Sequence, residues 1–278
     1  MQYFVSDLVF PAFNKPELAK LAPSYGLEIF NEFGTEPYWN VVLPRLGVGS
    51  DGRRLTFHGP CVSLNLADPH DALYRVEYKD TFRLAAALGA RHVVIHTNEA
   101  LLPSQKTDAA ARHDAQEQVR SRLEEIIAVA ESVRRERSAA PLGNGEPFPL
   151  PVVENVGLHD NMLFNEEEYI DLIRSLPSCA ALLDLGHAHV NGWNLVRVIA
   201  KLQGHLVSYH VHDNDGTGDQ HLPVGRGTIP WKEVIAAMHQ YTPKADVVFE
   251  YANGTFPDAA ALADHLATIR NAFETAQL

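Results

Sequence analysis

Short runs of β-branched and aromatic residues alternate along the chain with longer stretches in which apolar residues recur at helical spacing. This alternation is typical of repeated strand–helix units with parallel strands. We expect eight strands, at Tyr3–Val5, Leu27–Phe30, Leu55–His58, His92–His96, Val152–Glu154, Ala181–Asp184, Leu206–Val211 and Val247–Glu250. Eight strands close a barrel, and 278 residues suit that fold, whose ordinary length is about 250 residues. The pattern predicts an α/β protein with a single (β/α)8 barrel domain over residues 1–278.

Three stretches between these strands have a clear helical pattern. The longest spans Ala110–Arg137, another spans Ala72–Leu88 and ends before Gly89, and the last spans Pro257–Phe273. In the second of these, we expect the apolar residues to lie largely on one side: Leu73, Val76, Tyr78, Leu84 and Leu88. The Pro/Gly-rich stretch Ala140–Pro151 lacks any helical period, and we interpret it as an extended loop between a helix and a strand.

Residues that can bind a metal ion recur where the predicted strands end. Six of the eight strands finish on one: His58, His96, Glu154, Asp184, His210 and Glu250. A single histidine after a strand is usually a hydrogen-bonded loop residue, and a single carboxylate often caps a turn. In a closed barrel, however, these ends converge on one face, where a bound cation would offset the cost of burying them. The recurrence therefore predicts a divalent-metal site.

The segment after the seventh predicted strand is rich in further donors. His212, Asp213 and Asp215 can be metal ligands, loop-forming residues or solvated side chains, and the sequence leaves all three interpretations open. Asp219 and His221 form a second ligand-like pair in the same segment.

Three larger side chains could complete a pocket. The glycines on either side of Arg226 suit a tight turn that would hold its guanidinium near a substrate oxygen or phosphate, and a solvated surface arginine is the alternative. Trp193 and Trp231 could shape the pocket wall, although either one alone is more often ordinary packing.

Charge and composition limit the classes of partner and the cellular location that we expect. The chain has 23 basic and 35 acidic residues, a formal net charge of −12, which disfavours nucleic acid as the main partner. Cys61 and Cys179 fit no metal or redox motif, so we expect reduced thiols in a cytoplasmic protein. The first residues do not form a signal peptide, and the sequence has no apolar run of the roughly 20 residues that span a bilayer.

Seven motifs together resemble the xylose isomerase-like TIM barrel superfamily, which contains sugar and sugar-phosphate isomerases and epimerases and the endonuclease IV type of AP endonuclease. They are F-H-G-P-C-V-S-L-N-L at 57–66, V-V-I-H at 93–96, V-V-E-N-V at 152–156, L-L-D-L-G-H-A-H at 182–189, Y-H-V-H-D-N-D-G at 209–216, D-Q-H-L-P-V-G-R-G-T-I-P-W at 219–231 and V-F-E-Y at 248–251. They extend from the third predicted strand to the eighth.

This resemblance implies one Mn, Zn, Mg or Co ion, and its ligands would be Glu154, Asp184, His210 and Glu250. The two glutamates would also act as catalytic base and acid, while His187 and Arg226 would orient substrate oxygens. The endonuclease branch uses a fuller zinc set, and this chain has a candidate at each further place: His58, His96, His187, Asp219 and His221.

We therefore expect a divalent-metal-dependent isomerase or epimerase that moves a proton next to the carbonyl of a sugar or sugar phosphate. The alternative is a zinc-dependent phosphodiester hydrolase of the AP endonuclease type. A barrel that binds metal or sugar without turnover is the weakest interpretation, because both glutamates are present. The expected partner is a small molecule rather than a membrane or nucleic acid, and a homo-oligomer is compatible with the sequence.

Overall fold

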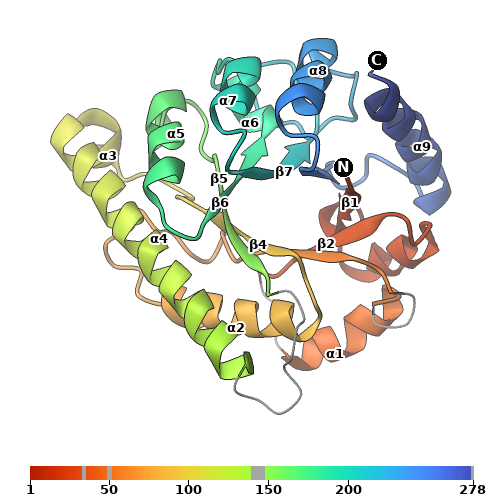
Figure 1. The fold of residues 1–278 in the computed structure, drawn as a ribbon, viewed down its shortest axis with the longest axis horizontal. Coiled ribbons are helices and arrows are strands. Elements are labelled where there is room, and N and C mark those ends of the chain that lie inside the picture. The colour runs from red at the N-terminus through yellow and green to blue at the C-terminus, as the bar shows by residue number, and fades with distance from the viewer. Residues whose placement is uncertain (33–35, 49–51, 139–147, 277–278) are drawn as a thin grey trace.

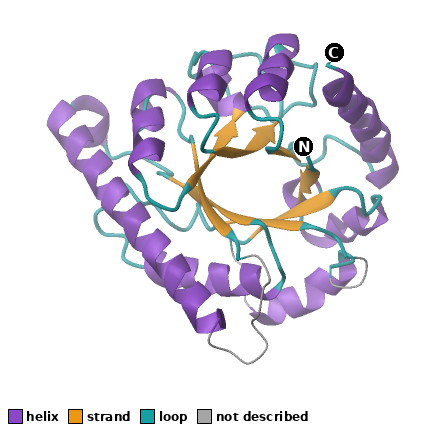
Figure 2. Cartoon of the chain, in the orientation of Figure 1, coloured by secondary structure: helices purple, strands orange, loops and turns teal. Residues whose placement is uncertain are grey.

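The computed structural model describes residues 1–32, 36–48, 52–138 and 148–276. Eight parallel strands, β1 to β8, pair in chain order and close into a barrel, with β1 hydrogen-bonded to β8. Figure 1 shows the helices arranged around this ring, and Figure 2 shows the strands at its centre. The strands are Tyr3–Ser6, Gly26–Phe30, Leu55–His58, His92–His96, Leu150–Glu154, Ala180–Asp184, Leu206–Val211 and Asp246–Phe249. The predicted fold is confirmed.

The α-helices are α1 (Glu36–Arg45), α2 (Tyr74–Ala87), α3 (Pro103–Thr107), α4 (Ala109–Ser138), α5 (Glu166–Ser175), α6 (Leu185–Val190), α7 (Leu195–Lys201), α8 (Trp231–Tyr241) and α9 (Ala259–Thr275). Short 3₁₀ helices cover Asp7–Val9, Ala12–Lys20 and His159–Asn161. The three predicted helices correspond to α2, α4 and α9. In the part of the chain that the structure describes, no helix is long and apolar enough to cross a membrane.

Two details of the predicted elements are wrong. Leu73 and Val76 do not face the core, since 62% and 58% of their surfaces are exposed. Helix α2 instead buries a stripe that includes Tyr74, Tyr78 and Phe82, because aromatic residues four apart lie on one face. The predicted loop over Ala140–Pro151 ends too late, since β5 already begins at Leu150. Residues 140–147 of that loop lie outside the described residues.

The interior of the barrel has an apolar side and a polar side. Strands β4, β5 and β6 contribute the apolar cluster of Val94, Val152, Ala180 and Leu182. Glu28 on β2, Thr56 on β3 and His210 on β7 are all fully buried and hydrogen-bonded to one another through Glu28. Because successive strand side chains point to opposite faces, Leu27 and Ile29 on either side of Glu28 pack outward against the helices. The polar side leads up to the carboxyl ends of the strands.

Candidate metal centre

A cavity of about 460 Å³ opens at the carboxyl ends of the strands. The residues of its wall that can bind a metal are His58, Cys61, His96, Glu99, Glu154, His187, Asp219, His221 and Glu250. Asp184 and His210 are fully buried and contact these carboxylates and imidazoles. Glu250 follows β8 directly, so six strand ends deliver their metal-capable residues to one place, as their positions in the sequence suggested.

The centre of this site is the Nδ1 atom of His210. It lies 3.3 Å from Glu154 Oε1, 3.7 Å from Asp184 Oδ2 and 3.2 Å from Glu250 Oε2. We call these four residues the central group. The sequence predicts them as one ligand set, and the barrel brings them together from β5, β6, β7 and the end of β8.

The central group has the chemistry of a cation site. His210 Nε2 is hydrogen-bonded to Glu28 Oε1 at 2.9 Å, whereas the buried Nδ1 atom has no hydrogen-bond partner among the described residues. Burial by itself would lower the pKa of His210, but the carboxylates of Glu250, Glu154 and Glu28 raise it well above its ordinary value. A divalent ion would satisfy Nδ1 and the three carboxylates at once, so these residues fit a metal.

The carboxylate of Glu154 is shared with a second donor group. His58 Nδ1 donates to the Gly59 carbonyl at 2.8 Å, which leaves the lone pair of neutral His58 on Nε2. That Nε2 lies 3.1 Å from His96 Nε2, which in turn lies 3.1 Å from Glu154 Oε2. Burial would raise the pKa of Glu154, but the charges of His210 and His96 hold it well below its usual range.

A third donor group forms beside the first two. His187 Nδ1 and His221 Nδ1 lie 3.0 Å and 2.8 Å from the carbonyls of Asn155 and Glu250, so both Nε2 atoms are free to act as ligands. These Nε2 atoms lie 3.2 Å and 3.0 Å from Asp219 Oδ2. Burial would lower the pKa of His221, but Asp219 and Glu250 raise it to about 9.

The loop that carries Asp219 and His221 is organised by Asp213. The buried Asp213 carboxylate accepts hydrogen bonds from the Gly225 and Ile229 backbones and from the Trp231 indole, at 2.9, 3.2 and 2.8 Å. His221 is held at φ 45°, a conformation that residues other than glycine rarely adopt. The loop therefore aims His221 at the centre at a conformational cost.

The three residues that the sequence left open have different roles. Asp213 forms the loop, as described above. Asp215 is exposed and accepts the Thr217 backbone N–H at 2.9 Å, which is a turn-forming contact. His212 is fully buried, and its Nε2 lies 3.1 Å from Asp184 Oδ2, so it supports a member of the central group.

Three predicted site residues lie elsewhere. Arg226 is exposed and does not line the cavity. Its charge acts on His265 instead: burial lowers the pKa of His265, and the positive charge of Arg226 lowers it further. Trp231 is in the core, bonded to Asp213, and Trp193 packs on Tyr169 with ring centroids 5.7 Å apart. The two tryptophans therefore form part of the packing instead of the cavity wall.

Sequence reasoning missed residues that support the site. Asn155 donates from Nδ2 to the Asp184 carbonyl and accepts the Asp184 N–H, at 3.0 and 2.8 Å. Cys61 lines the cavity, and burial raises the pKa of its thiol, which keeps it neutral. Glu28 is the buried partner of His210. The one sequence signal for Glu28 is a charged residue in the middle of the apolar strand G-L-E-I-F.

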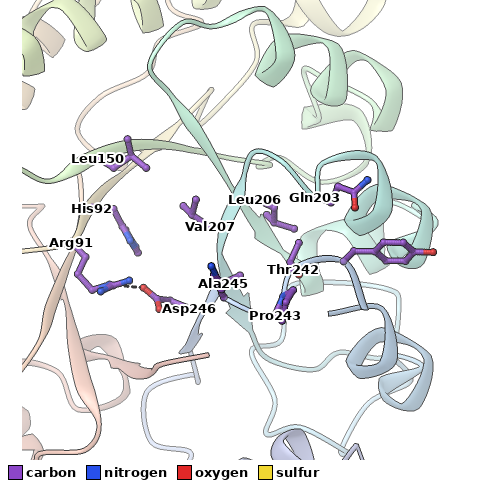
Figure 3. A pocket seen from close by; sticks show the side chains of 12 residues that line it. Arg91, His92, Leu150, Gln203, Leu206, Val207, Thr242, Pro243, Ala245 and Asp246 are labelled. Carbon is purple, nitrogen blue, oxygen red and sulfur yellow. Dashed lines mark hydrogen bonds and ion pairs between the residues drawn. The ribbon is translucent and has the colours of Figure 1, made fainter. Parts of the chain in front are cut away.

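A second cavity, of about 510 Å³, lies at the opposite end of the barrel (Figure 3). The first residues of β4, β5, β7 and β8 line it, and Arg91 donates to Asp246 Oδ2 at 2.7 Å across one side. The amino ends of barrel strands usually serve stability, and the carboxyl ends carry the active site. We therefore place the function in the smaller cavity.

Comparison with known proteins agrees with this geometry. The sequence model of the xylose isomerase-like TIM barrel family matches residues 17–272. The chain belongs to this family. An uncharacterized protein of Methanocaldococcus jannaschii is 24% identical over 198 residues, which are 66% of this chain and 69% of that protein.

Several solved structures share the whole fold. A D-tagatose 3-epimerase-like protein superposes with a TM-score of 0.78 at 20% identity, covering 99% of this chain and 98% of that one. A D-psicose 3-epimerase from Clostridium cellulolyticum H10 gives 0.72 at 16% identity, with 100% and 99% covered. An IolI protein with a bound zinc atom gives 0.71 at 15% identity, with 100% and 98% covered. At these identities the likeness shows the fold.

Proposed function

We propose that this protein is a divalent-metal-dependent sugar epimerase or isomerase. The observation that carries the proposal is that two buried glutamates, Glu154 and Glu250, lie 3.3 Å and 3.2 Å from the unpartnered Nδ1 atom of His210. Two carboxylates beside one metal site can take a proton from one face of a carbon and return it to the other. The printed names of the structural neighbours, which include sugar 3-epimerases, support the same reaction class.

In this proposal Glu154, Asp184, His210 and Glu250 hold the ion. When bound, the ion polarises the substrate carbonyl and the adjacent hydroxyl, which makes the C–H between them more acidic. One glutamate removes that proton and the other supplies a proton to the opposite face or to the neighbouring carbon. His187 lies beside Glu154, with its Nδ1 atom 3.4 Å from Glu154 Oε1, and is placed to contact a substrate oxygen.

The charge of the cavity favours a neutral sugar over a sugar phosphate. Its described lining contains Glu99, Glu154, Asp219 and Glu250 and no lysine or arginine. A phosphate group in such a site would lack the guanidinium or ammonium partner that usually binds it. The lysine of the adjoining cavity, Lys15, is already paired with Asp7. We infer that the substrate is an uncharged sugar such as a ketohexose.

The second candidate function is metal-dependent phosphoester hydrolysis. The observation that favours it is the surplus of ligands, since two further donor groups lie beside the central one: His58 and His96 with Glu154, and His187 and His221 with Asp219. Several ions side by side can bind both the attacking and the leaving oxygen of a displacement. One tightly bound ion per chain supports the first function, and two or three support the second.

Hydrogen exchange tests the leading proposal. The metal-loaded protein is incubated in D2O with D-tagatose, D-psicose and D-fructose, and deuterium in the sugars is followed by NMR. We expect deuterium on the carbon next to the carbonyl, together with the epimerised product. Failure of every ketohexose and aldohexose to exchange, in protein that holds metal, would contradict the proposal.

Variants then assign the roles. Glu154→Gln and Glu250→Gln should each slow exchange by about 10²–10⁴-fold, the usual contribution of a general acid or base. Asp246→Asn removes a buried acid at the opposite end of the barrel and should leave the exchange rate close to that of the wild type. Near wild-type exchange in both of the first two variants would exclude the two-glutamate mechanism.

A further inference from the structure

We propose that Glu28 is a positioning residue, which fixes His210 so that its Nδ1 lone pair faces the metal. The inference rests on the proposed metal centre and concerns a residue outside the cavity wall. Glu28 lies on β2 and His210 on β7, strands that are not neighbours in the barrel. Their side chains meet across the interior, with Glu28 Oε1 2.9 Å from His210 Nε2.

The carboxylate of Glu28 is itself held in place. It is fully buried, and Thr56 donates to its Oε2 atom at 3.0 Å. His92 approaches the same oxygen, with its Nε2 atom at 3.7 Å. Glu28 is therefore a fixed hydrogen-bond acceptor under the metal centre.

A carboxylate can only accept a hydrogen bond, so the contact places a proton on Nε2 of His210. In the neutral ring the lone pair is then on Nδ1, which points at Glu154 and Glu250. Without Glu28, the other tautomer would donate from Nδ1 to those same carboxylates. That hydrogen bond would occupy the atoms that a cation needs, so the loss of Glu28 should weaken metal binding.

Glu28 also lies within reach of Glu250 and His210 in a cluster that could hold an ion by itself. The position of its carboxylate argues against Glu28 as a ligand of the central ion. Its Oε1 atom is hydrogen-bonded to Nε2 of His210, whereas the carboxylates of the central group surround Nδ1 on the opposite side of the ring.

The test measures Co²⁺ binding to the full-length metal-free protein. Loss of a carboxylate that supports a metal-ligating histidine typically costs 10–100-fold in affinity, so we expect this loss in Glu28→Leu. Glu28→Gln keeps an acceptor oxygen and should lose less Co²⁺ affinity than Glu28→Leu. The visible spectrum of bound Co²⁺ should change in Glu28→Leu, because a reoriented imidazole alters the ligand geometry. For the sugar that exchanges, kcat should fall while KM changes little.

Asp246→Asn is the matched control, since Asp246 is a buried acid at the far end of the barrel, paired with Arg91 (Figure 3). It should keep the wild-type Co²⁺ affinity and spectrum. Folding of each variant is checked by thermal melting of the metal-free protein. If Glu28→Leu does not fold, the Co²⁺ affinity of Glu28→Gln tests the inference in its place. Wild-type Co²⁺ affinity in a folded Glu28 variant would overturn the inference. Because this readout needs no sugar, it is independent of whether the epimerase proposal holds.

Discussion

His187, His221 and His58 share one arrangement, in which a backbone carbonyl accepts from Nδ1 and leaves Nε2 for a ligand. A backbone carbonyl is a stronger constraint than a side chain, because its position is fixed by the barrel itself. Each imidazole is therefore oriented before any ion arrives, which lowers the cost of binding. His210 differs, since the side chain of Glu28 performs this task.

At the residue scale, metal binding should release protons. The carboxylates of Glu250, Glu154 and Glu28 raise the pKa of His210 in the metal-free protein well above its ordinary value near 6.5, so this ring is charged at pH 7. A metal ion binds only the neutral ring, so apparent metal affinity should rise as the pH is raised above 7. Calorimetric titration with Zn²⁺ in buffers of different ionisation enthalpy measures the protons released. Binding without proton release at pH 7 would contradict these assignments.

At the element scale, the strands were predictable and the loops were not. The predicted bounds of each strand agree with the structure to within about two residues, because a buried parallel strand is a short apolar run flanked by polar or turn-forming residues. The same logic placed Glu154, Asp184 and Glu250 at strand ends. Because the strand ends of a closed barrel converge on one face, no other sequence signal was needed to predict that these residues lie together.

The roles of the remaining site residues depend on contacts between distant parts of the chain, which the local sequence pattern does not predict. Glu28 and His210 are 182 residues apart, and nothing near Glu28 indicates which strand lies across the interior. Asp213 could be identified as a loop former only from its distant donors, which are the Gly225 and Ile229 backbones and the indole of Trp231 at the start of α8. For Arg226 the sequence left both a pocket residue and a solvated surface arginine open, since a position between two glycines does not fix where the guanidinium points.

Helix α6 gives a prediction of its own. A Cβ atom at Gly186 would lie 2.0 Å from Cε1 of His212, whose Nε2 contacts Asp184. Gly186→Ala should therefore displace His212 and cost about 1–3 kcal/mol of stability, together with a loss of metal affinity. Gly204→Ala is the control, because nothing lies within 4 Å of a Cβ there. Melting temperatures and Co²⁺ titrations of the two variants provide the comparison, and equal behaviour would refute the role given to His212.

At the scale of the whole molecule, charge separates the two candidate functions. Binding to duplex DNA requires several lysine or arginine contacts to phosphates, and the net charge here is −12. Arg53 and Arg54 precede β3 and so lie at its amino end. Arg53 donates to the Leu18 and Leu21 carbonyls, and Arg54 to the Ser24 carbonyl. The described cavity lining has no lysine or arginine of its own.

We therefore expect no incision of duplex DNA that contains a single abasic site, even at low salt with zinc present. A shorter phosphoester could still reach bound ions, so the same assay includes a small phosphodiester as a comparison. Efficient, metal-dependent cleavage of the duplex beside the abasic site would favour the hydrolase function over the epimerase function.

The most direct test of the account is the metal content of the untreated protein and of variants of the central group. We predict at least one equivalent of a divalent transition metal, lost on chelation, and a melting temperature that rises when Mn²⁺, Co²⁺ or Zn²⁺ is restored. At 100 times Kd, such binding adds about 2.7 kcal/mol to stability. Asp184→Ala and His210→Ala should abolish both effects. Less than about a tenth of an equivalent of every transition metal, with no change in melting temperature on metal addition, would contradict the account, given so rich a ligand set.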